Sequence, residues 1–224
     1  MVLGDNSLAT MYNLPHHREH DLDTIRSFMI DHPFAFLTGC NASHEPVATQ
    51  IPLLVEERKG NLTLCGHVMK HTDHHKAFAD NPHVLAIFTG PSTYVSGAWY
   101  SNPNTPSTWN YVSVHAKGKL RIIDANKLEP LLQKLSLHFE KDKLESPTVY
   151  ENLPRSFTSR ALELIVGFEI DVDEIHHVVK LSQDRDKESY RNIINELKQQ
   201  GLDQQYIAHE MEKRFSLQFS DQEQ

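Results

Sequence analysis

The chain has 224 residues, of which 39% are hydrophobic and 23% charged, as in an ordinary soluble globular protein. Its formal net charge of −8, with no basic block, argues against extensive contact with duplex DNA, whose phosphates attract Lys and Arg. No apolar run approaches the roughly 20 residues of a membrane helix, the first residues lack a secretory pattern, and two cysteines exclude a disulfide framework. We therefore expect a cytoplasmic protein.

The first half of the chain predicts one helix followed by a run of strands. The helix is expected from about residue 22 to residue 30, with Asp21 as its N-cap and Pro33 beyond its end. Apolar or alternating runs then predict an antiparallel meander, with strands at 34–40, 46–55 and 61–67. Pro52 should place its strand at an edge or a bulge. A short helix is expected at 73–79.

The second half predicts more strands and then helices. Strands are expected at 83–90, 93–99, 111–123 and 162–172, with a Pro/Asn-rich loop at 100–110 and a helix at 126–141. Gly118 suggests a bulge. Six or seven strands at this spacing suit a closed antiparallel barrel. We expect 1–10 to be a loose leader, 11–185 to form the barrel domain, and 186–224 to be a C-terminal helical extension.

The stretch GHVMKHTDHHK contains four histidines and two lysines. His67, His71 and His75 have the spacing of metal ligands on a helix, but His67 belongs to the end of a strand and no Cys, Asp or Glu pattern completes a site. The stretch is also consistent with a solvated helix start. A third interpretation is an anion site, because a helix N-terminus presents N–H groups and positive dipole, while Lys70 adds charge and Thr72 a hydroxyl donor.

Both tryptophans, Trp99 and Trp109, fall in the stretch GAWYSNPNTPSTWNY, together with Tyr100 and Tyr111. Four aromatic residues around a Pro/Asn-rich loop suggest a rigid apolar wall for a flat ligand or a partner. The alternative is a minor core beneath a long loop.

The segment KLSQDR, residues 180–185, combines two cations, a hydroxyl and an amide. Arg185 could bind an anion through its guanidinium fork. From these letters alone, an ordinary salt-bridged linker is the favoured interpretation.

Two further features are expected to carry no chemistry. Cys40 and Cys65 lie inside predicted strands, so we expect both to be buried and inert. The last helices could form a helix-turn-helix around Gly201, but the would-be recognition helix at 203–214 is net acidic, whereas helices that read DNA are basic.

Several segments together resemble the PaiB family of FMN-binding, negative transcriptional regulators of protease and sporulation genes. They are MYNLPHH, GHVMKHTDHH, YVSGAWY, PSTWNYVSVHAKGKLRIID and KLSQDR, and the likeness runs from about Met11 to Arg214. The resemblance implies a mainly β (α+β) fold, an antiparallel, Greek-key-like FMN-binding split barrel with flanking helices. It also implies FMN as cofactor and a homodimer with two flavin sites at the subunit interface.

The resemblance further implies which residues contact the flavin. Carried over by position, Thr49 and Gln50 border it; His67, Lys70 and Thr72 hold its phosphate; Trp99, Trp109 and Asn110 shape the pocket, from the same or the partner chain; and Lys180, Gln183 and Arg185 close it.

The chain departs from the family pattern at three of the positions in these motifs. Met69 stands where the family has a small residue, and Thr72 and Asp184 stand where it has Asn. The Asp184 charge should weaken the binding of an anionic ligand unless Lys180 or Arg185 pairs with it.

The implied function is therefore regulatory, through DNA or a regulatory protein partner. Two alternatives remain. A bound flavin could oxidise or reduce a small substrate, since flavin chemistry asks the protein chiefly for positioning and electrostatics. The histidine cluster could instead bind haem or a metal. The residues identify no catalytic group and no metal ligand.

Overall fold

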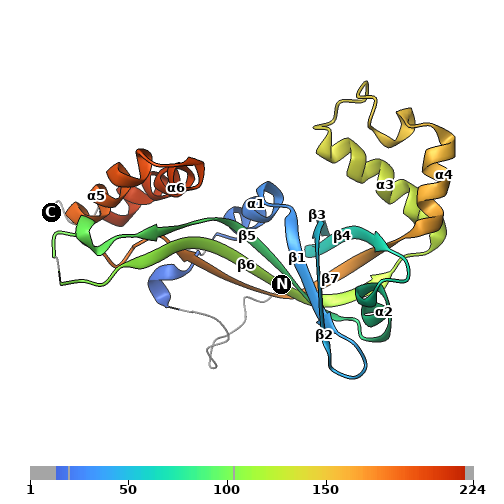
Figure 1. Ribbon diagram of the computed structural model, residues 1–224, viewed down its shortest axis with the longest axis horizontal. Coiled ribbons are helices and arrows are strands. Elements are labelled where there is room, and N and C mark those ends of the chain that lie inside the picture. Colours follow the sequence, from blue (N-terminus) through green and yellow to red (C-terminus); the bar gives the residue numbers. More distant parts are fainter. Residues whose placement is uncertain (1–13, 20, 103, 220–224) are drawn as a thin grey trace. The chain divides into compact units, whose positions relative to one another are not determined.

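The computed structural model describes residues 14–19, 21–102 and 104–219 (Figure 1). The expected leader at 1–10 lies outside these residues. Within them, seven strands form one sheet in the order β2-β1-β5-β6-β7-β4-β3. The strands are β1 (Phe34–Cys40), β2 (Pro46–Pro52), β3 (Leu54–Arg58), β4 (Asn61–Met69), β5 (His83–Val95), β6 (Thr108–Ile122) and β7 (Ile165–Lys180).

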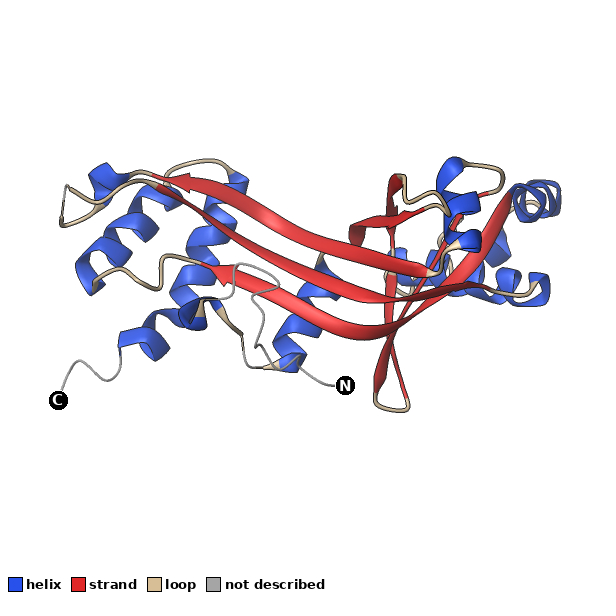
Figure 2. Ribbon diagram, turned by 90° about the horizontal axis from the view of Figure 1, so that it is seen from below, coloured by secondary structure: helices blue, strands red, loops and turns tan. Residues whose placement is uncertain are grey.

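Helices flank this sheet (Figure 2). They are α1 (Leu22–Asp31), α2 (Asp73–Asp80), α3 (Ala125–Phe139), α4 (Arg155–Leu164), α5 (Lys187–Lys198) and α6 (Leu202–Phe219), with short 3₁₀ turns η1 (Pro15–His17), η2 (Gly97–Trp99) and η3 (Tyr150–Asn152). None of the helices in the described part of the chain combines the length and apolar character that crossing a bilayer requires.

The sheet curls into a split barrel, which confirms the predicted fold class. β2 and β3 occupy opposite edges of the sheet, yet Leu53 alone separates them in the chain. One residue spans only about 3.5 Å, so the two edges must approach each other, and β2 does contact β4. The register is antiparallel where β1 pairs with β2 and β5, and where β4 pairs with β3 and β7.

The described residues group into two compact units. The barrel unit comprises 29–88 and 115–175; the helix unit comprises 14–19, 21–28, 89–102, 104–114 and 176–219. The α5 and α6 helices begin after residue 185, where we expected the helical extension. The domain boundary at 185 stays a prediction.

The barrel unit has its core between the strands and two helices. Phe78 of α2 is buried against Gly39 of β1, where an added Cβ would lie 3.1 Å from the Phe78 ring. That contact fixes α2 beside β1 and β2. On another face, Leu131 and Leu132 of α3 pack with Leu135 against β3 and β4.

The helix unit has a core of its own. The apolar faces of α5 and α6 pack against the ends of β5, β6 and β7, and the side chains that meet there include Val95, Val112, Val179, Leu181, Tyr190, Ile193, Leu197, Ile207 and Met211. Each fully buried aliphatic side chain of this kind contributes about 1.5–3 kcal/mol.

The structure corrects several of the expected elements. The run at 46–55 is two strands interrupted at Leu53, and 83–95 is a single strand rather than two. β6 begins at Thr108, inside the expected loop, and α4 was not predicted. Gly118 lies within β6, where its lack of a side chain admits a carbonyl oxygen of β7, 2.3 Å from where a Cβ would stand; the predicted bulge there stays a prediction.

Candidate functional site

The candidate site lies in the barrel unit, where β4 ends and α2 begins. Gly66 of β4 pairs with Phe168 of β7, and a Cβ at Gly66 would lie 2.9 Å from the side chains of Leu53 and Phe168. Only glycine fits there without displacing them. His67 follows, and burial lowers its pKa. His67 is therefore a neutral hydrogen-bonding group near pH 7 rather than a positive charge.

The first turn of α2 is capped by its own residues. Thr72 Oγ1 accepts the His75 N–H at 3.3 Å and donates to the Met69 carbonyl at 2.9 Å. Asp73 Oδ1 accepts the His74 N–H at 2.8 Å, the largest of the interactions that lower the pKa of Asp73. The chain's own oxygens thus take up N–H groups that the sequence assigned to an anion, and Asp73 adds a negative charge.

Lys70 supplies positive charge at this corner, and its side chain is held in place. Its Nζ donates to the Glu163 carbonyl at 2.8 Å and to the Leu162 carbonyl at 3.4 Å. Its backbone N–H donates to the Leu164 carbonyl at 2.8 Å. An ammonium group has three N–H donors, so one donor remains beyond these two carbonyls.

The remaining histidines of the stretch organise the turn. His71 has a positive φ of 68°, and its N–H donates to His75 Nδ1 at 3.1 Å. Burial first, and then the neighbouring His71, lowers the pKa of His75. In the part of the chain that the structure describes, no group of three or more His, Cys, Asp or Glu side chains is arranged to hold a metal ion.

The two predicted residues of β2 lie close to this corner. Thr49 pairs with Leu37 and Gln50 with Phe36 across the β1–β2 ladder. The β2 strand contacts both α2 and β4. The five predicted residues of the barrel unit (Thr49, Gln50, His67, Lys70 and Thr72) are thus carried by elements that contact one another.

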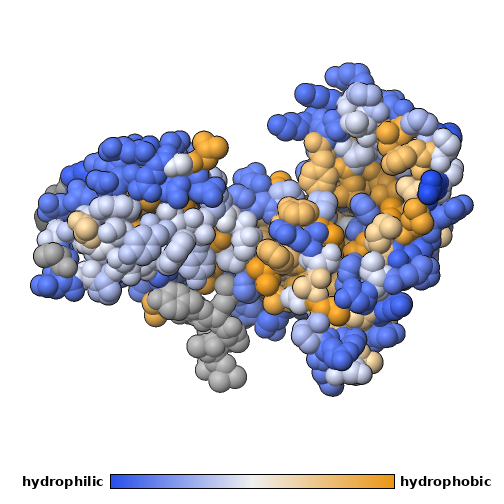
Figure 3. Space-filling model, in the orientation of Figure 1, coloured by the Kyte–Doolittle hydropathy of each residue, from blue (hydrophilic) through white to orange (hydrophobic). Residues whose placement is uncertain are grey.

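An exposed apolar face borders this corner. Phe34 and Phe36 point outward from β1 and are 55% and 44% exposed, while the alternate residues Ala35 and Leu37 are buried. Gln50 is exposed directly opposite Phe36. Figure 3 shows hydrophobic side chains reaching the surface over the region of β1.

The other six predicted residues lie in the helix unit, and three of them are on η2 and β6. Trp109 on β6 is 54% exposed and meets Tyr94 of β5 edge-on, with ring centroids 6.0 Å apart. Trp99 lies in η2 and packs on the core of the helix unit. Asn110 is fully buried, and its Oδ1 accepts from Ser182 Oγ at 3.0 Å.

The KLSQDR segment is bonded within the helix unit. Lys180 Nζ donates to Thr108 Oγ1 at 2.6 Å. Arg185 pairs with Asp184 at 2.8 Å and lies 4.9 Å from the centre of the Tyr100 ring. Arg185 therefore neutralises the Asp184 charge, one of the two pairings that we considered.

Gln183 also serves the fold, since its Oε1 accepts the Leu181 N–H at 2.7 Å. The assignment of these six residues and the five in the barrel unit to one flavin site stays a prediction.

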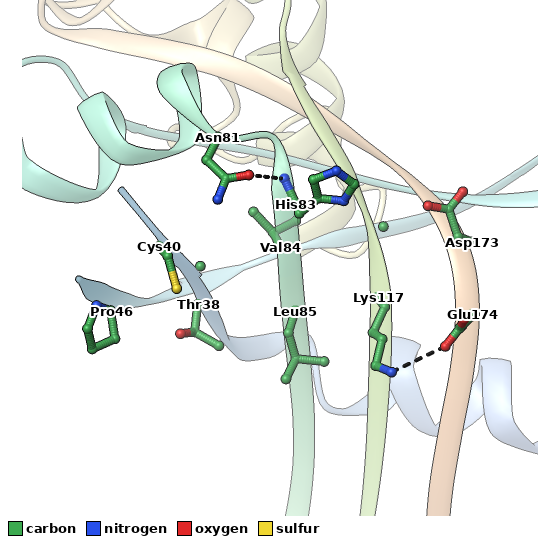
Figure 4. Close-up of a pocket in the computed structure, with 12 residues that line it drawn as sticks. Thr38, Cys40, Pro46, Asn81, His83, Val84, Leu85, Lys117, Asp173 and Glu174 are labelled. Atoms are coloured by element: carbon green, nitrogen blue, oxygen red, sulfur yellow. Dashed lines mark hydrogen bonds and ion pairs between the residues drawn. The ribbon is translucent and has the colours of Figure 1, made fainter. Parts of the chain in front are cut away.

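The barrel unit also contains a pocket of about 520 Å³ that sequence reasoning missed (Figure 4). Its lining includes Cys40, His83, Lys117 and Glu174, from four different strands, and Lys117 pairs with Glu174 at 3.2 Å. No motif joins residues so far apart in the chain. Cys40 is only half-buried, contrary to our expectation, whereas Cys65 is buried as expected.

Comparison with known proteins defines the class. The sequence model of a family described as "Putative FMN-binding domain" matches residues 11–174. The chain is 33% identical over 153 residues to "Protease synthase and sporulation protein PAI 2" of Bacillus subtilis, covering 68% of this chain and 73% of that protein. It is 25% identical over 232 residues to an uncharacterized protein of Emericella nidulans, covering 86% and 92%.

Among solved structures, the FAD and heme binding protein from Mycobacterium smegmatis has a similar fold, with a TM-score of 0.54 at 16% identity over 72% of each chain. The chain belongs to the PaiB-type FMN-binding domain family, and the resemblance seen in its sequence is confirmed. The family description names FMN, which is the cofactor that the sequence predicts.

Proposed function

We propose that the protein binds FMN at the corner of the barrel unit where β2, β4 and α2 meet, and that it acts as a flavin-binding regulator. The observation that carries the proposal is the tethered Lys70 ammonium, with a donor remaining, inside the region that matches the FMN-binding family. A phosphate is the anion that such a donor suits.

The residues at this corner fit the parts of FMN. Lys70 and the neutral imidazole of His67 would donate to the phosphate. The negative charge of Asp73 would repel the phosphate from the first turn of α2, so the phosphate should lie on the Lys70 side of the turn. Gln50 and the exposed Phe36 offer a polar edge and an apolar surface to the flat ring. Bound FMN would supply redox chemistry, and these side chains would bind and orient it.

We further propose that a second copy of the chain covers the exposed face of β1. Phe34 and Phe36 expose about half of their surface on one face of β1, and burying that half would contribute roughly 1 kcal/mol for each side chain. The homodimer that the family resemblance implies provides such a cover. Light scattering on Phe36→Asp should then show a monomer where the wild-type chain is a dimer.

The regulatory role is proposed to operate through a protein partner rather than through direct DNA binding. A relative at 33% identity carries the name protease synthase and sporulation protein. The α6 helix, however, pairs its own cations with acids, since Lys213 and Arg214 both bond to Glu210 at 2.7 Å. These cations are therefore poorly available to phosphates, and the net charge of −8 opposes DNA further.

The test is to titrate FMN with the purified chain at fixed ionic strength and to measure binding from the change in flavin fluorescence. Loss of one charge-assisted bond should make Lys70→Met bind FMN about tenfold more weakly. Lys76→Met is the matched control, since Lys76 is exposed on α2 and its loss removes the same charge. Failure of the wild-type chain to bind FMN, or equal weakening by both substitutions, would contradict the proposed site.

A further inference from the structure

We propose that the C-terminal turn of α4 positions the Lys70 ammonium for the flavin phosphate, so that α4 and the bound flavin stabilise each other. This inference rests on the proposed FMN site and adds a second element to it. No side chain of α4 takes part, because its contribution is made by backbone carbonyl groups.

The contact is a three-bond junction inside the barrel unit. Lys70 donates through Nζ to the carbonyls of Glu163 and Leu162, at 2.8 and 3.4 Å, and through its backbone N–H to the carbonyl of Leu164, at 2.8 Å. The last three carbonyls of α4 are thus all satisfied by one residue of the turn between β4 and α2. The last four carbonyls of a helix have no partner within the helix.

The Lys70 ammonium supplies the C-terminal end of α4 with positive charge. The last turn of α4 carries no basic residue, while Glu163 places a negative charge at the negative end of the helix dipole. The helix passes directly into β7 at Ile165, so no glycine cap terminates it. Lys70 provides from outside the positive charge that the helix lacks.

Besides this junction, α4 is held by an exposed ion pair of Arg155 with Glu129 at 3.6 Å and by a single buried side chain. It has ten residues, an N-cap residue, Pro154, that makes no side-chain cap bond, and one buried residue, Thr158. Phe157 and Leu164 are exposed. A helix of this length is marginal by itself in water, so the stability of its last turn should depend measurably on Lys70.

The same contact prepares Lys70 for an anion. A lysine side chain has many rotamers, and ordering them on binding lowers affinity. In this structure two α4 carbonyls already hold the ammonium, and its third N–H remains for a phosphate oxygen. If α4 strengthens flavin binding in this way, bound flavin must strengthen α4 by the same factor.

The test is hydrogen–deuterium exchange of the full chain, read at the amides of residues 160–164, with and without FMN. In the protein without FMN, Lys70→Met should speed exchange there about two- to fivefold, whereas Lys76→Met should leave it unchanged. Saturating FMN should slow exchange in the wild-type chain and in Lys76→Met, but not in Lys70→Met.

A second pair of variants tests the reverse direction without touching Lys70. Ser159 is exposed on α4, and Ser159→Gly should loosen the helix relative to Ser159→Ala by up to about fivefold in its opening equilibrium. FMN should bind more weakly to the Gly variant than to the Ala variant. Equal affinities, with α4 exchange demonstrably faster in the Gly variant, would overturn the inference.

The two proposals fail differently. If flavin fluorescence shows FMN bound while exchange in α4 is unchanged or faster, the coupling is refuted and the FMN site stands. If the wild-type chain binds no FMN, the site and the coupling both fall, even if Lys70 is shown to hold α4.

Discussion

Asn110 is a residue for which the family resemblance and the structure suggest different roles. The resemblance places it in the flavin pocket, but its side chain is fully buried in the helix unit. Its Oδ1 accepts from Ser182 Oγ at 3.0 Å, and its Nδ2 lies 3.6 Å from Met211 Sδ. We predict that Asn110→Ala acts first on stability.

The magnitude follows from what the substitution leaves behind. Ser182 is 1% exposed, so removing the amide leaves its hydroxyl buried without this acceptor, at a cost of about 1–3 kcal/mol. The vacated volume adds a cavity term. We expect the free energy of unfolding to fall by about 2–3 kcal/mol in total, which lowers the urea midpoint by about 1 M.

The assay is urea unfolding followed by tryptophan fluorescence. Trp99 and Trp109 are the only tryptophans in the sequence and both lie in the helix unit, so the signal reports on that unit. In a double-mutant cycle, Asn110→Ala with Ser182→Ala should cost at least about 1 kcal/mol less than the sum of the single changes. A loss below about 0.5 kcal/mol in Asn110→Ala, with FMN affinity strongly reduced, would refute the structural role.

Substitutions at three other residues test separate features. Gly118→Ala should cost about 3 kcal/mol, because its Cβ would stand 2.3 Å from a carbonyl oxygen of β7; a loss under about 1 kcal/mol by circular dichroism would contradict that close approach. Asp186 caps α5 by accepting the Ser189 N–H at 2.9 Å, so Asp186→Ala should cost about 1–2 kcal/mol. Hydrogen bonds, first from the Ser189 side chain, lower the pKa of Asp186 to about 2. Because this pKa lies below the ordinary value, the wild-type chain should lose that stability as the pH falls from about 4 through about 2. The uncharged Asp186→Asn variant should not show this pH-dependent loss. Equal loss of stability with falling pH in the two proteins would contradict the role of the Asp186 charge. Burial raises the pKa of Cys65 to about 12, so a thiol reagent near pH 8 should label Cys40 first. Cys40→Ser should therefore remove the fast phase of labelling. A fast phase that persists in Cys40→Ser would contradict this assignment.

The sequence predicted elements whose local signals agree with their packing. The α1 helix starts as expected, with Asp21 Oδ1 accepting the Asp23 N–H at 3.1 Å and Oδ2 the Thr24 hydroxyl at 2.7 Å. The β1 strand spans Phe34–Cys40, the range that its apolar run predicts. Pro52 lies on β2, an edge strand, as its missing N–H requires.

Other elements lacked a local signal that agrees with their packing. The α4 helix has Phe157, Ala161 and Leu164 at helical spacing, but it buries only Thr158, so burial of an apolar face does not account for it. The apolar run at 46–55 reads as one strand, and its interruption at Leu53 depends on the two edges of the barrel meeting there. β5 continues through Pro91 and Ser92, residues that in isolation indicate a turn.

In the candidate site too, the sequence predicted some features and gave no local signal for others. Lys70 was predicted as a cation near a phosphate, but the two bonds of its side chain to α4 are made to backbone oxygens, which any sequence would provide. Likewise, Thr72 was predicted as a donor, and its use as the cap of α2 follows from where the helix begins. The pocket around Cys40 and His83 requires the register of strands far apart in the chain.

The single-residue link at Leu53 has a consequence for the order of folding. The β3–β4 hairpin follows β2 immediately in the chain, yet β4 finds its second partner in β7, with Thr63 opposite Asp171, more than 100 residues later. During synthesis on a ribosome, the side of β4 that pairs with β7 therefore has no strand partner until most of the chain has emerged. Pairing of such high contact order is slow, and an apolar strand such as β4 is prone to misassociation during that interval.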